Sequence, residues 1–567
     1  MIIKKRGCES TIQEVFLRNI GAKNITEVNQ WFLKSYRGEY KLYDAKKFVS
    51  KILPYRNRKI RLVGDYDVDG ISALYILITG LRKAGFTKVS YRIPTRQEGF
   101  GISTKIIEEC LRDGIELIIT CDNGIAEIEP ISLAKRNGIS VIVTDHHQPK
   151  KSDGKIVLPN ADLIINPNAI ENSSDYVGYC GAGICYKLMC ELNKNDSYIK
   201  HALQIMAAIA TIADVVQLRE ENYVIVKNGL KKLENYNLLS SGMIALLTTL
   251  GITSPVTSKS IAFKLAPCLN AGERMYPGGA RDILNLLLYN GPLEKALDYA
   301  KKCIDINEKR KICTKKALEQ AHKILEEKGM SIPLVLYIPN AKEGILGIIA
   351  NKLSDIYKVP SIVFTDGANK DELKGSGRNY GDYDLKGHLD MIAHHILKYG
   401  GHKPAAGMTI AKDSFNAFKD AIINVSHDFK VKEDDTAFYD IEIEASQMPK
   451  AMEEIEKYEP FGNGNNAIKI LAKNFTAIPN GGKYCKFLGS ENSVVKISSK
   501  NGDAISFNLA DSFRKKTSTP IIMNAVGILN KKHFMGKTSI QLEFEQFVEV
   551  KRTLKRTTLA DKILKIS

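Results

Sequence analysis

The sequence predicts an α/β protein with a parallel sheet, a long linking helix, a second α/β region and a C-terminal β-barrel. Three apolar runs of strand length, 59–64, 116–120 and 141–144, are each followed by a stretch with helical character. Strands that alternate with helices are typical of a parallel sheet. After residue 435 the pattern changes to short alternating strands separated by turns, which favours a small barrel.

Acidic and imidazole side chains directly follow the three apolar runs. They are Asp65, Asp67, Asp69, Asp122, Asp145, His146 and His147. The carboxyl ends of parallel strands open onto the same edge of a sheet, so we expect these side chains to converge. A single Asp at a strand-to-helix turn is often only a helix N-cap. Seven such residues at three strand ends indicate a site instead.

A cluster of five carboxylates needs cations. The carboxylates would repel one another and raise each other's pKa, and divalent metal ions remove that cost. Oxygen ligands with one or two imidazoles suit Mn²⁺ or Mg²⁺ better than structural Zn²⁺. The ligand count is sufficient for two ions, and a pair of ions can activate water and stabilise the leaving oxygen of a phosphoester.

Four segments resemble the metal-binding motifs of the DHH phosphoesterases. They are 64–70, 121–124, 144–148 and 213–218. The resemblance implies two Mn²⁺ or Mg²⁺ ions held by Asp67, Asp69, Asp122, His146 and Asp214. It also implies that Asp65 and Asp145 lie in or next to this ligand set and that His147 lies near the scissile phosphate. His147 and Asp145 are the candidate catalytic residues. Many members have His where this chain has Val63, so the first metal site either lacks an imidazole or recruits Asp65.

The chain is basic, with a net charge of +17 and a pI near 9.1. Such a charge favours a polyanionic partner, either nucleic acid or an anionic membrane surface. No run of 18 apolar residues and no signal-peptide core is found in the sequence, and its ten Cys form no CxxC pair. We therefore expect a cytoplasmic protein with free thiols.

A chain of 567 residues is too long for one core. We expect a helical N-terminal extension over 1–45, the metal-bearing domain over 46–221 and a helical region over 222–330. The stretch from Pro292 to Lys328 has helical periodicity and no Pro or Gly after its first residue. It predicts a long helix that either holds two domains apart or packs along one of them.

A second α/β domain is expected over 331–434. Gly-rich segments at 343–347, 374–378 and 400–407 place small residues beside Ser, Arg, His and Lys, a combination suited to phosphate oxygens. The last two segments resemble the nucleic-acid-binding DHH-associated domain. The candidate phosphate ligands in them are Ser376, Arg378 and His402.

The last region, 435–550, resembles the OB-fold of the single-strand-specific exonucleases in the DHH family, as does the preceding segment 458–465. A basic tail follows over 551–567. By the same resemblance Arg96, Ser376 and Arg378 would bind a 5′-terminal phosphate. Asn270 and Arg274 resemble another family motif, which Glu273 interrupts, so the role of Arg274 stays open.

The resemblance implies a 5′-to-3′ exonuclease for single-stranded DNA that uses two metal ions in DNA repair and recombination. We expect a monomer without a membrane partner, working with a single-strand-binding protein and a helicase. One alternative is a DHH phosphodiesterase for short oligonucleotides or cyclic dinucleotides. Another is a catalytically silent nucleic-acid-binding module.

Overall fold

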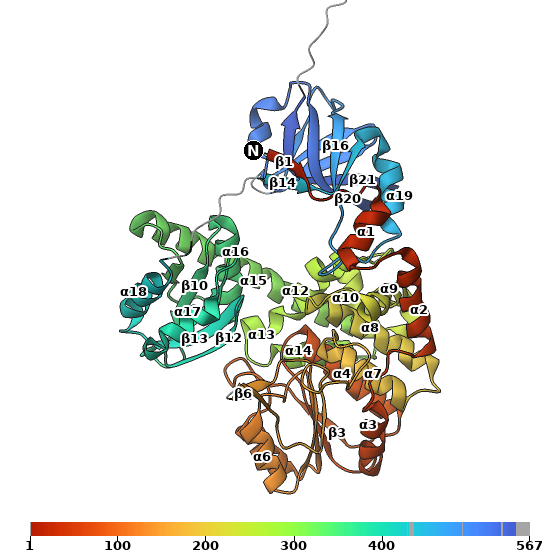
Figure 1. Cartoon of the computed structure of the whole chain (residues 1–567), viewed down its shortest axis with the longest axis vertical. Coiled ribbons are helices and arrows are strands. Elements are labelled where there is room, and N and C mark those ends of the chain that lie inside the picture. The colour runs from red at the N-terminus through yellow and green to blue at the C-terminus, as the bar shows by residue number, and fades with distance from the viewer. Residues whose placement is uncertain are drawn as a thin grey trace, which may run out of the picture. The chain divides into compact units, whose positions relative to one another are not determined.

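The computed structural model describes residues 2–152, 154–427, 429, 436–489, 492–534 and 537–550, and the predicted basic tail lies outside these ranges. The chain divides into two compact units (Figure 1). Trp31–Glu433 form the large unit, and Met1–Gln30 with Asp434–Ser567 form the small unit. Within the described ranges, no helix combines the length and the apolar character needed to cross a membrane.

A five-stranded parallel sheet with the order β3-β2-β4-β5-β8 is the centre of the large unit. The central strands β4 and β5 are almost fully buried because helices cover both faces of the sheet. Leu62 packs on the side of α3, α4 and α7, whereas Val63 packs on the side of α5 and α6. The elements are β2 (Ile60–Val63), β3 (Val89–Arg92), β4 (Leu117–Cys121), β5 (Ser140–Thr144), β8 (Leu163–Ile165), α3 (Ala45–Ile52), α4 (Val68–Lys83), α5 (Thr104–Asp113), α6 (Ile128–Arg136) and α7 (Gly181–Leu192), with a small hairpin of β6 (Lys150–Ser152) and β7 (Lys155–Val157).

The order of this sheet creates a topological switch point. The chain places β3 on one side of β2 and then crosses to place β4 on the other side. In open parallel sheets, ligands bind outside the carboxyl ends of the strands at such a point. The predicted parallel sheet is confirmed, and the switch point lies between the strands that precede Asp65 and Asp122.

A helical region follows the sheet and ends in the predicted long helix. That helix, α15, covers Leu293–Lys328 and ends at Gly329, whose φ of 78° suits a residue without a Cβ. Its buried residues contribute to the cores on both sides of it. The preceding helices are α8 (Ser197–Ala213), α9 (Glu220–Leu233), α10 (Ser241–Thr249), α11 (Ser258–Ser260), α12 (Ala266–Leu269), α13 (Ala271–Met275) and α14 (Gly279–Leu288).

The second α/β region is a mixed sheet with the order β12-β13-β11-β10-β9, in which only β9 and β10 run parallel. Leu334 and Leu336 face α15 and α16, while Val335 faces α17 and α18. The elements are β9 (Leu334–Tyr337), β10 (Ser361–Asp366), β11 (Glu372–Arg378), β12 (Lys398–His402), β13 (Ala405–Ala411), α16 (Leu346–Tyr357), α17 (Leu385–Met391) and α18 (Phe415–Val425).

The small unit contains a seven-stranded sheet with the order β15-β16-β20-β21-β19-β18-β17. The expected region of short strands is confirmed, and among the described residues no pairing joins β15 to β17. Its elements are β14 (Thr436–Tyr439), β15 (Ile441–Glu444), α19 (Met448–Glu456), β16 (Lys469–Thr476), β17 (Lys486–Leu488), β18 (Val494–Ser499), β19 (Gly502–Ser506), β20 (Ile522–Phe534) and β21 (Lys537–Glu549).

The N-terminal segment differs from the helical extension expected over 1–45. Residues Ile2–Lys5 form β1, which pairs in parallel with β14. Helix α1 (Ile12–Ile20) then contributes Val15 to the core of the small unit. The next helix, α2 (Ile25–Arg37), contains residues of both units. The first 30 residues are therefore an integral part of the small unit.

Candidate metal centre and phosphate site

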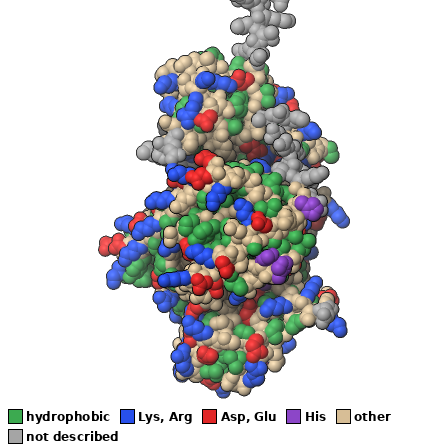
Figure 2. All heavy atoms as spheres, turned by 90° about the vertical axis from the view of Figure 1, so that its left-hand side faces the viewer, with side chains coloured by type: hydrophobic (Ala, Val, Ile, Leu, Met, Phe, Trp, Pro, Cys, Tyr) green, Lys and Arg blue, Asp and Glu red, His purple; other side chains and the backbone are tan. Residues whose placement is uncertain are grey.

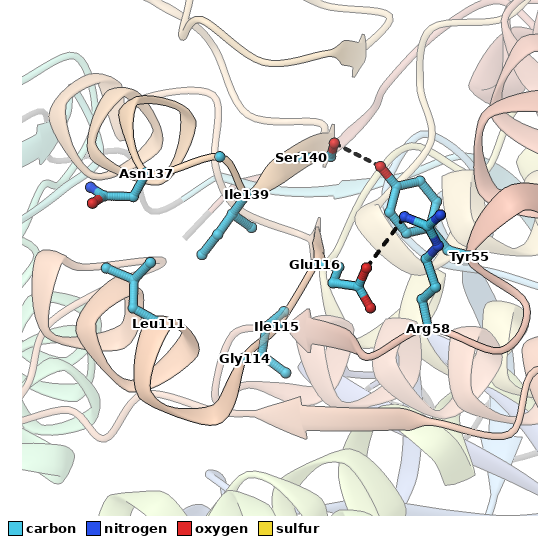
Figure 3. A pocket seen from close by; sticks show the side chains of 10 residues that line it. Tyr55, Arg58, Leu111, Gly114, Ile115, Glu116, Asn137, Ile139 and Ser140 are labelled. Atoms are coloured by element: carbon cyan, nitrogen blue, oxygen red, sulfur yellow. Dashed lines mark hydrogen bonds and ion pairs between the residues drawn. The ribbon is translucent and has the colours of Figure 1, made fainter.

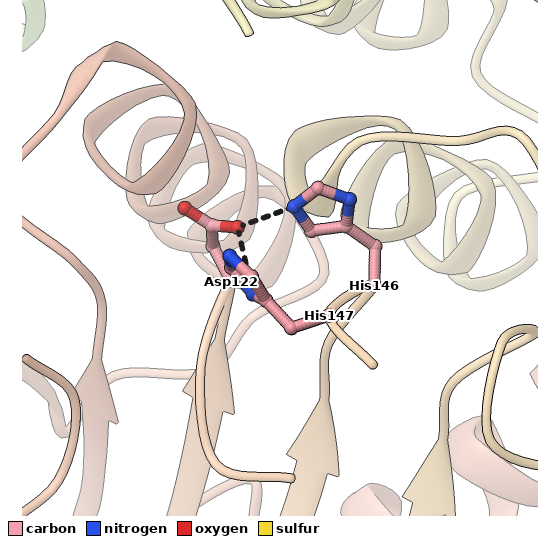
Figure 4. A group of neighbouring side chains, drawn as sticks. All are labelled: Asp122, His146 and His147. Carbon is pink, nitrogen blue, oxygen red and sulfur yellow. Dashed lines mark ion pairs between the residues drawn. The ribbon is translucent and has the colours of Figure 1, made fainter. Parts of the chain in front are cut away.

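The structure brings the strand-end carboxylates and imidazoles together at the switch point. The potential ligand atoms form three groups, in each of which the atoms lie within 4.8 Å of one another, and Asp122 belongs to two of the groups. His146 Nε2 is 3.2 Å from Asp122 Oδ1, and Figure 4 shows both imidazoles turned toward this carboxylate. The three groups are Asp65, Asp67 and Asp122; Asp69, His146 and Asp214; and Asp122, His146 and His147.

The positions of these ligands depend on segments of backbone that pass very close to one another. Asp122 has a φ of 63°, a left-handed conformation that Asp tolerates better than most residues. A Cβ on Gly181 would lie 2.6 Å from the Cβ of Asp122, and a Cβ on Gly70 would lie 2.5 Å from the backbone of Asp65. Glycine at these two positions lets α7 and α4 begin directly against the site.

Helix N-termini hold two of the carboxylates. Asp67 is the N-cap of α4 and accepts a hydrogen bond from the Gly70 N–H at 3.0 Å. Asp69 accepts from the N–H groups of Gly181 and Ala182, the first two residues of α7, at 2.6 and 2.8 Å. These bonds fix the direction of each carboxylate before any cation binds.

The electrostatics of the cluster fit divalent cations. Burial and the charges of Asp69 and Asp67 raise the pKa of Asp122 well above its usual range, and the same three causes raise the pKa of Asp214 to about 8. Burial and Asp67 likewise raise the pKa of Asp65. The Oδ1 atoms of Asp65 and Asp122 are buried without a hydrogen-bond partner. Oxygen ligands of Mn²⁺ or Mg²⁺ would be satisfied in these positions.

Asp145 holds His147 and is not among the grouped ligand atoms. Its Oδ1 accepts from the backbone N–H groups of His146 and His147, and it lies 2.8 Å from His147 Nδ1. Its Oδ2 accepts from the Ile125 N–H. Burial opposes protonation of His147, but the hydrogen bond and charge of Asp145 raise the pKa of His147 to about 9. These contacts suit Asp145 to hold the His147 ring in place.

Val63 supplies no ligand. Its side chain is buried in the core beside α5 and α6, and its carbonyl accepts from the Asn123 side-chain amide at 3.0 Å. Asp65 instead stands in one group with Asp67 and Asp122.

Arginine side chains gather beside the carboxylates. The Arg96 guanidinium lies over the ring of Tyr66 at 4.4 Å, and its buried Nε has no hydrogen-bond partner. Burial, followed by the charges of Arg96 and Arg310, lowers the pKa of Arg274 to about 10. The charge of Arg378 also acts on that pKa, and we call Arg96, Arg274, Arg310 and Arg378 the arginine cluster. Among the described residues, no carboxylate forms an ion pair with any of them. A phosphate would satisfy these donors.

Ser376 and Arg378 lie against the beginning of α16. Arg378 Nη1 donates to Ser376 Oγ at 3.1 Å and to the Gly377 carbonyl at 2.7 Å. A Cβ on Gly347 would lie 2.5 Å from Arg378 Nη2. The Arg378 guanidinium therefore lies beside the N-terminus of α16, and a helix N-terminus itself attracts anions.

The remaining sequence candidates separate into two groups. Arg274 belongs to the arginine cluster and donates to the Gly344 carbonyl at 3.0 Å, so Glu273 does not displace it. No described contact joins Asn270, at the α12–α13 junction, or the exposed His402 to this cluster. Sequence reasoning missed Arg310 on α15. The available signal was the polar pair Asn307 and Arg310, one helical turn apart and hydrogen-bonded at 3.0 Å.

A hollow of about 360 Å³ at the opposite edge of the sheet carries no comparable site (Figure 3). It lies at the amino ends of β4 and β5. Its polar side chains are satisfied by one another, since Tyr55 donates to Ser140 at 2.8 Å and Arg58 pairs with Glu116 at 3.3 Å. Surface charge does not mark a site on the face in Figure 2 either, because Lys and Arg are spread over it and mixed with acidic residues.

Three family models match the chain. They are the DHH family N-terminal domain over 59–213, the DHHA1 domain over 333–428 and the RecJ OB domain over 439–546. The single-stranded-DNA-specific exonuclease RecJ of Haemophilus influenzae is 30% identical over 410 residues, which cover 68% of this chain and 70% of that protein. The chain belongs to the RecJ family. RecJ of Bacillus subtilis is 28% identical, over 80% of this chain and 56% of that protein.

Solved RecJ structures share this fold. An exonuclease RecJ bound to manganese is 29% identical, with a TM-score of 0.58 over 69% of this chain and 96% of that chain. RecJ of Thermus thermophilus in complex with Mn²⁺ is 24% identical, with a TM-score of 0.73 over 90% of this chain and 72% of that chain. The predicted order of DHH, DHH-associated and OB domains is thus that of the RecJ family.

Proposed function

We propose that the chain is a metal-dependent exonuclease that removes nucleotides from the 5′ end of single-stranded DNA. The observation that carries this proposal is the position of Arg96 over Tyr66, the residue between Asp65 and Asp67. This contact places the guanidinium groups, which suit a phosphate, next to the carboxylates, which suit cations. The RecJ relatives are named for this activity, which supports the substrate and the reaction.

In this proposal Asp65, Asp67 and Asp122 hold one cation, and Asp69, His146 and Asp214 hold the other, with Asp122 next to both sets. When bound, Mn²⁺ or Mg²⁺ supplies the positive charge that offsets these carboxylates, activates water and polarises the phosphodiester.

The chain's own residues position the strand. Arg96, Arg378 and Ser376 hold the 5′-terminal phosphate, so the following phosphodiester reaches the carboxylates. Arg274 and Arg310 add positive charge to the same pocket. His147, fixed by Asp145, would keep its Nε2 proton and donate a hydrogen bond from it to a phosphate oxygen as negative charge develops there.

We also infer that the protein acts in the cytoplasm, as a monomer, in DNA repair and recombination. Single strands with a free 5′ end must first be produced from duplex DNA. This requirement supports a helicase and a single-strand-binding protein as its partners. Co-sedimentation with such proteins on a DNA strand, against the chain alone, tests the inference.

The test is digestion of internally labelled DNA and RNA strands that carry a 5′-phosphate or a 5′-hydroxyl. Each strand is blocked at its 3′ end. We expect mononucleotides from the 5′ end of DNA in Mn²⁺ or Mg²⁺ and none in a chelator. Hydrolysis of di- and trinucleotides alone would instead identify a short-oligonucleotide phosphodiesterase. Products from the 3′ end of a 5′-blocked strand would contradict the polarity.

A further inference from the structure

A second cavity, of about 740 Å³, lies in the large unit among α2, α3, α7, α8 and α9. We call it the basic pocket; its main polar lining residues are Tyr40, Lys46, Lys187, Lys200, Glu221 and Lys232. None of its lining residues belongs to the metal centre or to the arginine cluster. We propose that the basic pocket binds a nucleoside phosphate. This inference does not depend on the proposed nuclease activity.

The charge of the pocket favours an anion. Six Lys or Arg line it against two Glu, counted over the lining residues. One of the two acids is already paired, because Lys187 Nζ donates to Glu221 Oε1 at 2.7 Å. Burial and then the charges of Lys232 and Lys200 lower the pKa of His201, which also lines the cavity. The local field is therefore positive.

Two buried polar atoms in the lining have no partner. They are the hydroxyl of Tyr40, a residue only 3% exposed, and Oε2 of Glu221. Buried polar groups in folded proteins are almost always hydrogen-bonded, so two unsatisfied groups in one cavity point to a ligand. Tyr40 can donate to an anionic oxygen, whereas the carboxylate form of Glu221, paired with Lys187, can only accept.

These two requirements define the ligand class. Inorganic phosphate accepts hydrogen bonds from Tyr40 and the lysines, but its single O–H belongs to a dianion that an ionised Glu221 repels. A nucleoside phosphate carries phosphate oxygens for the cations and sugar hydroxyls that donate to a carboxylate, as riboses do in other nucleotide sites. The aromatic rings of Phe32, Tyr36 and Tyr43 also line the cavity and can stack on a base.

The size of the pocket agrees with this class. Ligand cavities typically measure about 300–1,000 Å³. Two sources would supply the same chemistry: a deoxynucleoside monophosphate released by a nuclease, or a free ribonucleotide. Deoxyadenosine monophosphate and adenosine diphosphate distinguish these two sources, while adenosine and inorganic phosphate test each half of the ligand.

The experiment is isothermal titration calorimetry of the full chain in a chelator, so that divalent cations cannot recruit the nucleotide to the metal centre. We expect one of the two nucleotides to bind more tightly than adenosine or phosphate. Tyr40→Phe removes only the unpartnered hydroxyl, and it should weaken this binding about tenfold or more. Because that hydroxyl has no partner in the fold, the melting temperature should not fall.

Tyr179→Phe is the matched control. Its hydroxyl is equally buried and unpartnered, but Tyr179 does not line the pocket, so binding should not change. Lys232→Met should also weaken binding. The proposal is overturned if neither nucleotide binds at millimolar concentration. It is equally overturned if binding survives Tyr40→Phe and Lys232→Met but is lost in Arg96→Ala, because the nucleotide then occupies the arginine cluster.

Discussion

Glu273 accepts a hydrogen bond from the backbone N–H of Arg96 at 3.0 Å, across 177 positions of the sequence. The other carboxylate oxygen of this buried residue accepts from the N–H of Gly278 at 2.9 Å. The residue that interrupts the motif at 270–274 therefore ties the Arg96 loop to the turn between α13 and α14. We interpret the interruption as a support for the phosphate site.

Glu273→Gln should loosen that loop. A Gln side chain keeps one acceptor but turns an amide donor toward a backbone N–H, so we expect a loss of about 1–3 kcal/mol in the free energy of unfolding. The preference for 5′-phosphorylated over 5′-hydroxyl strands should fall with it. Urea unfolding and initial rates measure the two effects. Glu129→Gln, on the exposed side of α6, is the control and should change neither.

Glu98 braces the same loop and gives it a pH dependence. Burial opposes ionisation of Glu98, but hydrogen bonds from Thr95, Lys105 and Arg92 lower the pKa of Glu98 from 4.5 to about 2. The stabilisation is therefore complete above about pH 4.5 and is lost as the pH falls through about 2. Glu98→Gln should cost about 1–3 kcal/mol at neutral pH and much less near pH 2. A constant difference across this range, in chemical unfolding, would contradict the prediction.

Asp122→Asn should abolish hydrolysis in both Mn²⁺ and Mg²⁺. Asn is the sharper substitution because it tolerates the φ of 63°, whereas Ala would add a left-handed strain of about 1–2 kcal/mol. Without the buried charge, the metal-free protein should unfold at a higher temperature than the wild type, and Mn²⁺ should no longer raise that temperature. Asp390→Asn, which weakens an exposed ion pair with Lys386 and an exposed hydrogen bond from Tyr399, is the control. More than about a tenth of wild-type turnover would remove Asp122 from the site.

Arg378→Lys keeps the charge but loses the planar fork that donates two parallel hydrogen bonds to a phosphate. Digestion of 5′-phosphorylated strands should slow by about tenfold or more, while digestion of 5′-hydroxyl strands changes little. Initial rates on the two strands give the ratio, and Arg136→Lys at an exposed position is the control. Equal slowing of both substrates would place Arg378 along the strand instead of at its end.

A fragment of residues 31–433 tests the contribution of the small unit to substrate binding. Removal of 435–567 alone would leave β1 without β14 and Val15 without its core, so both segments of the unit have to be removed together. The slope of log affinity against log salt, about −0.7 per phosphate contacted on single strands, should become shallower. Hydrolysis of dinucleotides should persist. An unchanged slope in the folded fragment would mean that the large unit alone makes the phosphate contacts.

The metal cluster could be predicted because its signal is local. Each apolar run ends directly at Asp65, Asp122 or Asp145, and parallel pairing carries these ends to one edge. The hydrogen bonds that hold these carboxylates in place could not be predicted from the sequence in the same way. The bonds from the α7 amides to Asp69 span more than 110 positions, and only packing brings them together.

The arginine cluster was predicted in part for a similar reason. Arg378 stands in a Gly-flanked turn and Arg96 in a segment singled out by family resemblance, whereas Arg310 lies in a long helix rich in Lys and Glu. Its position next to Arg274 depends on the tertiary fold. The pairing of β1 with β14 was missed because four residues of an N-terminal segment carry no information about a partner 434 positions later.

That pairing has a consequence for synthesis on the ribosome. The chain makes Ile2–Lys5 first and their partner strand Thr436–Tyr439 only after the whole large unit. At about 5–20 residues per second, the first strand waits roughly 20–90 s for its partner. The large unit can fold as soon as it emerges, and the small unit closes last. A nascent chain stalled before residue 436 would thus carry the carboxylate cluster, while the strand Ile2–Lys5 would still lack its partner.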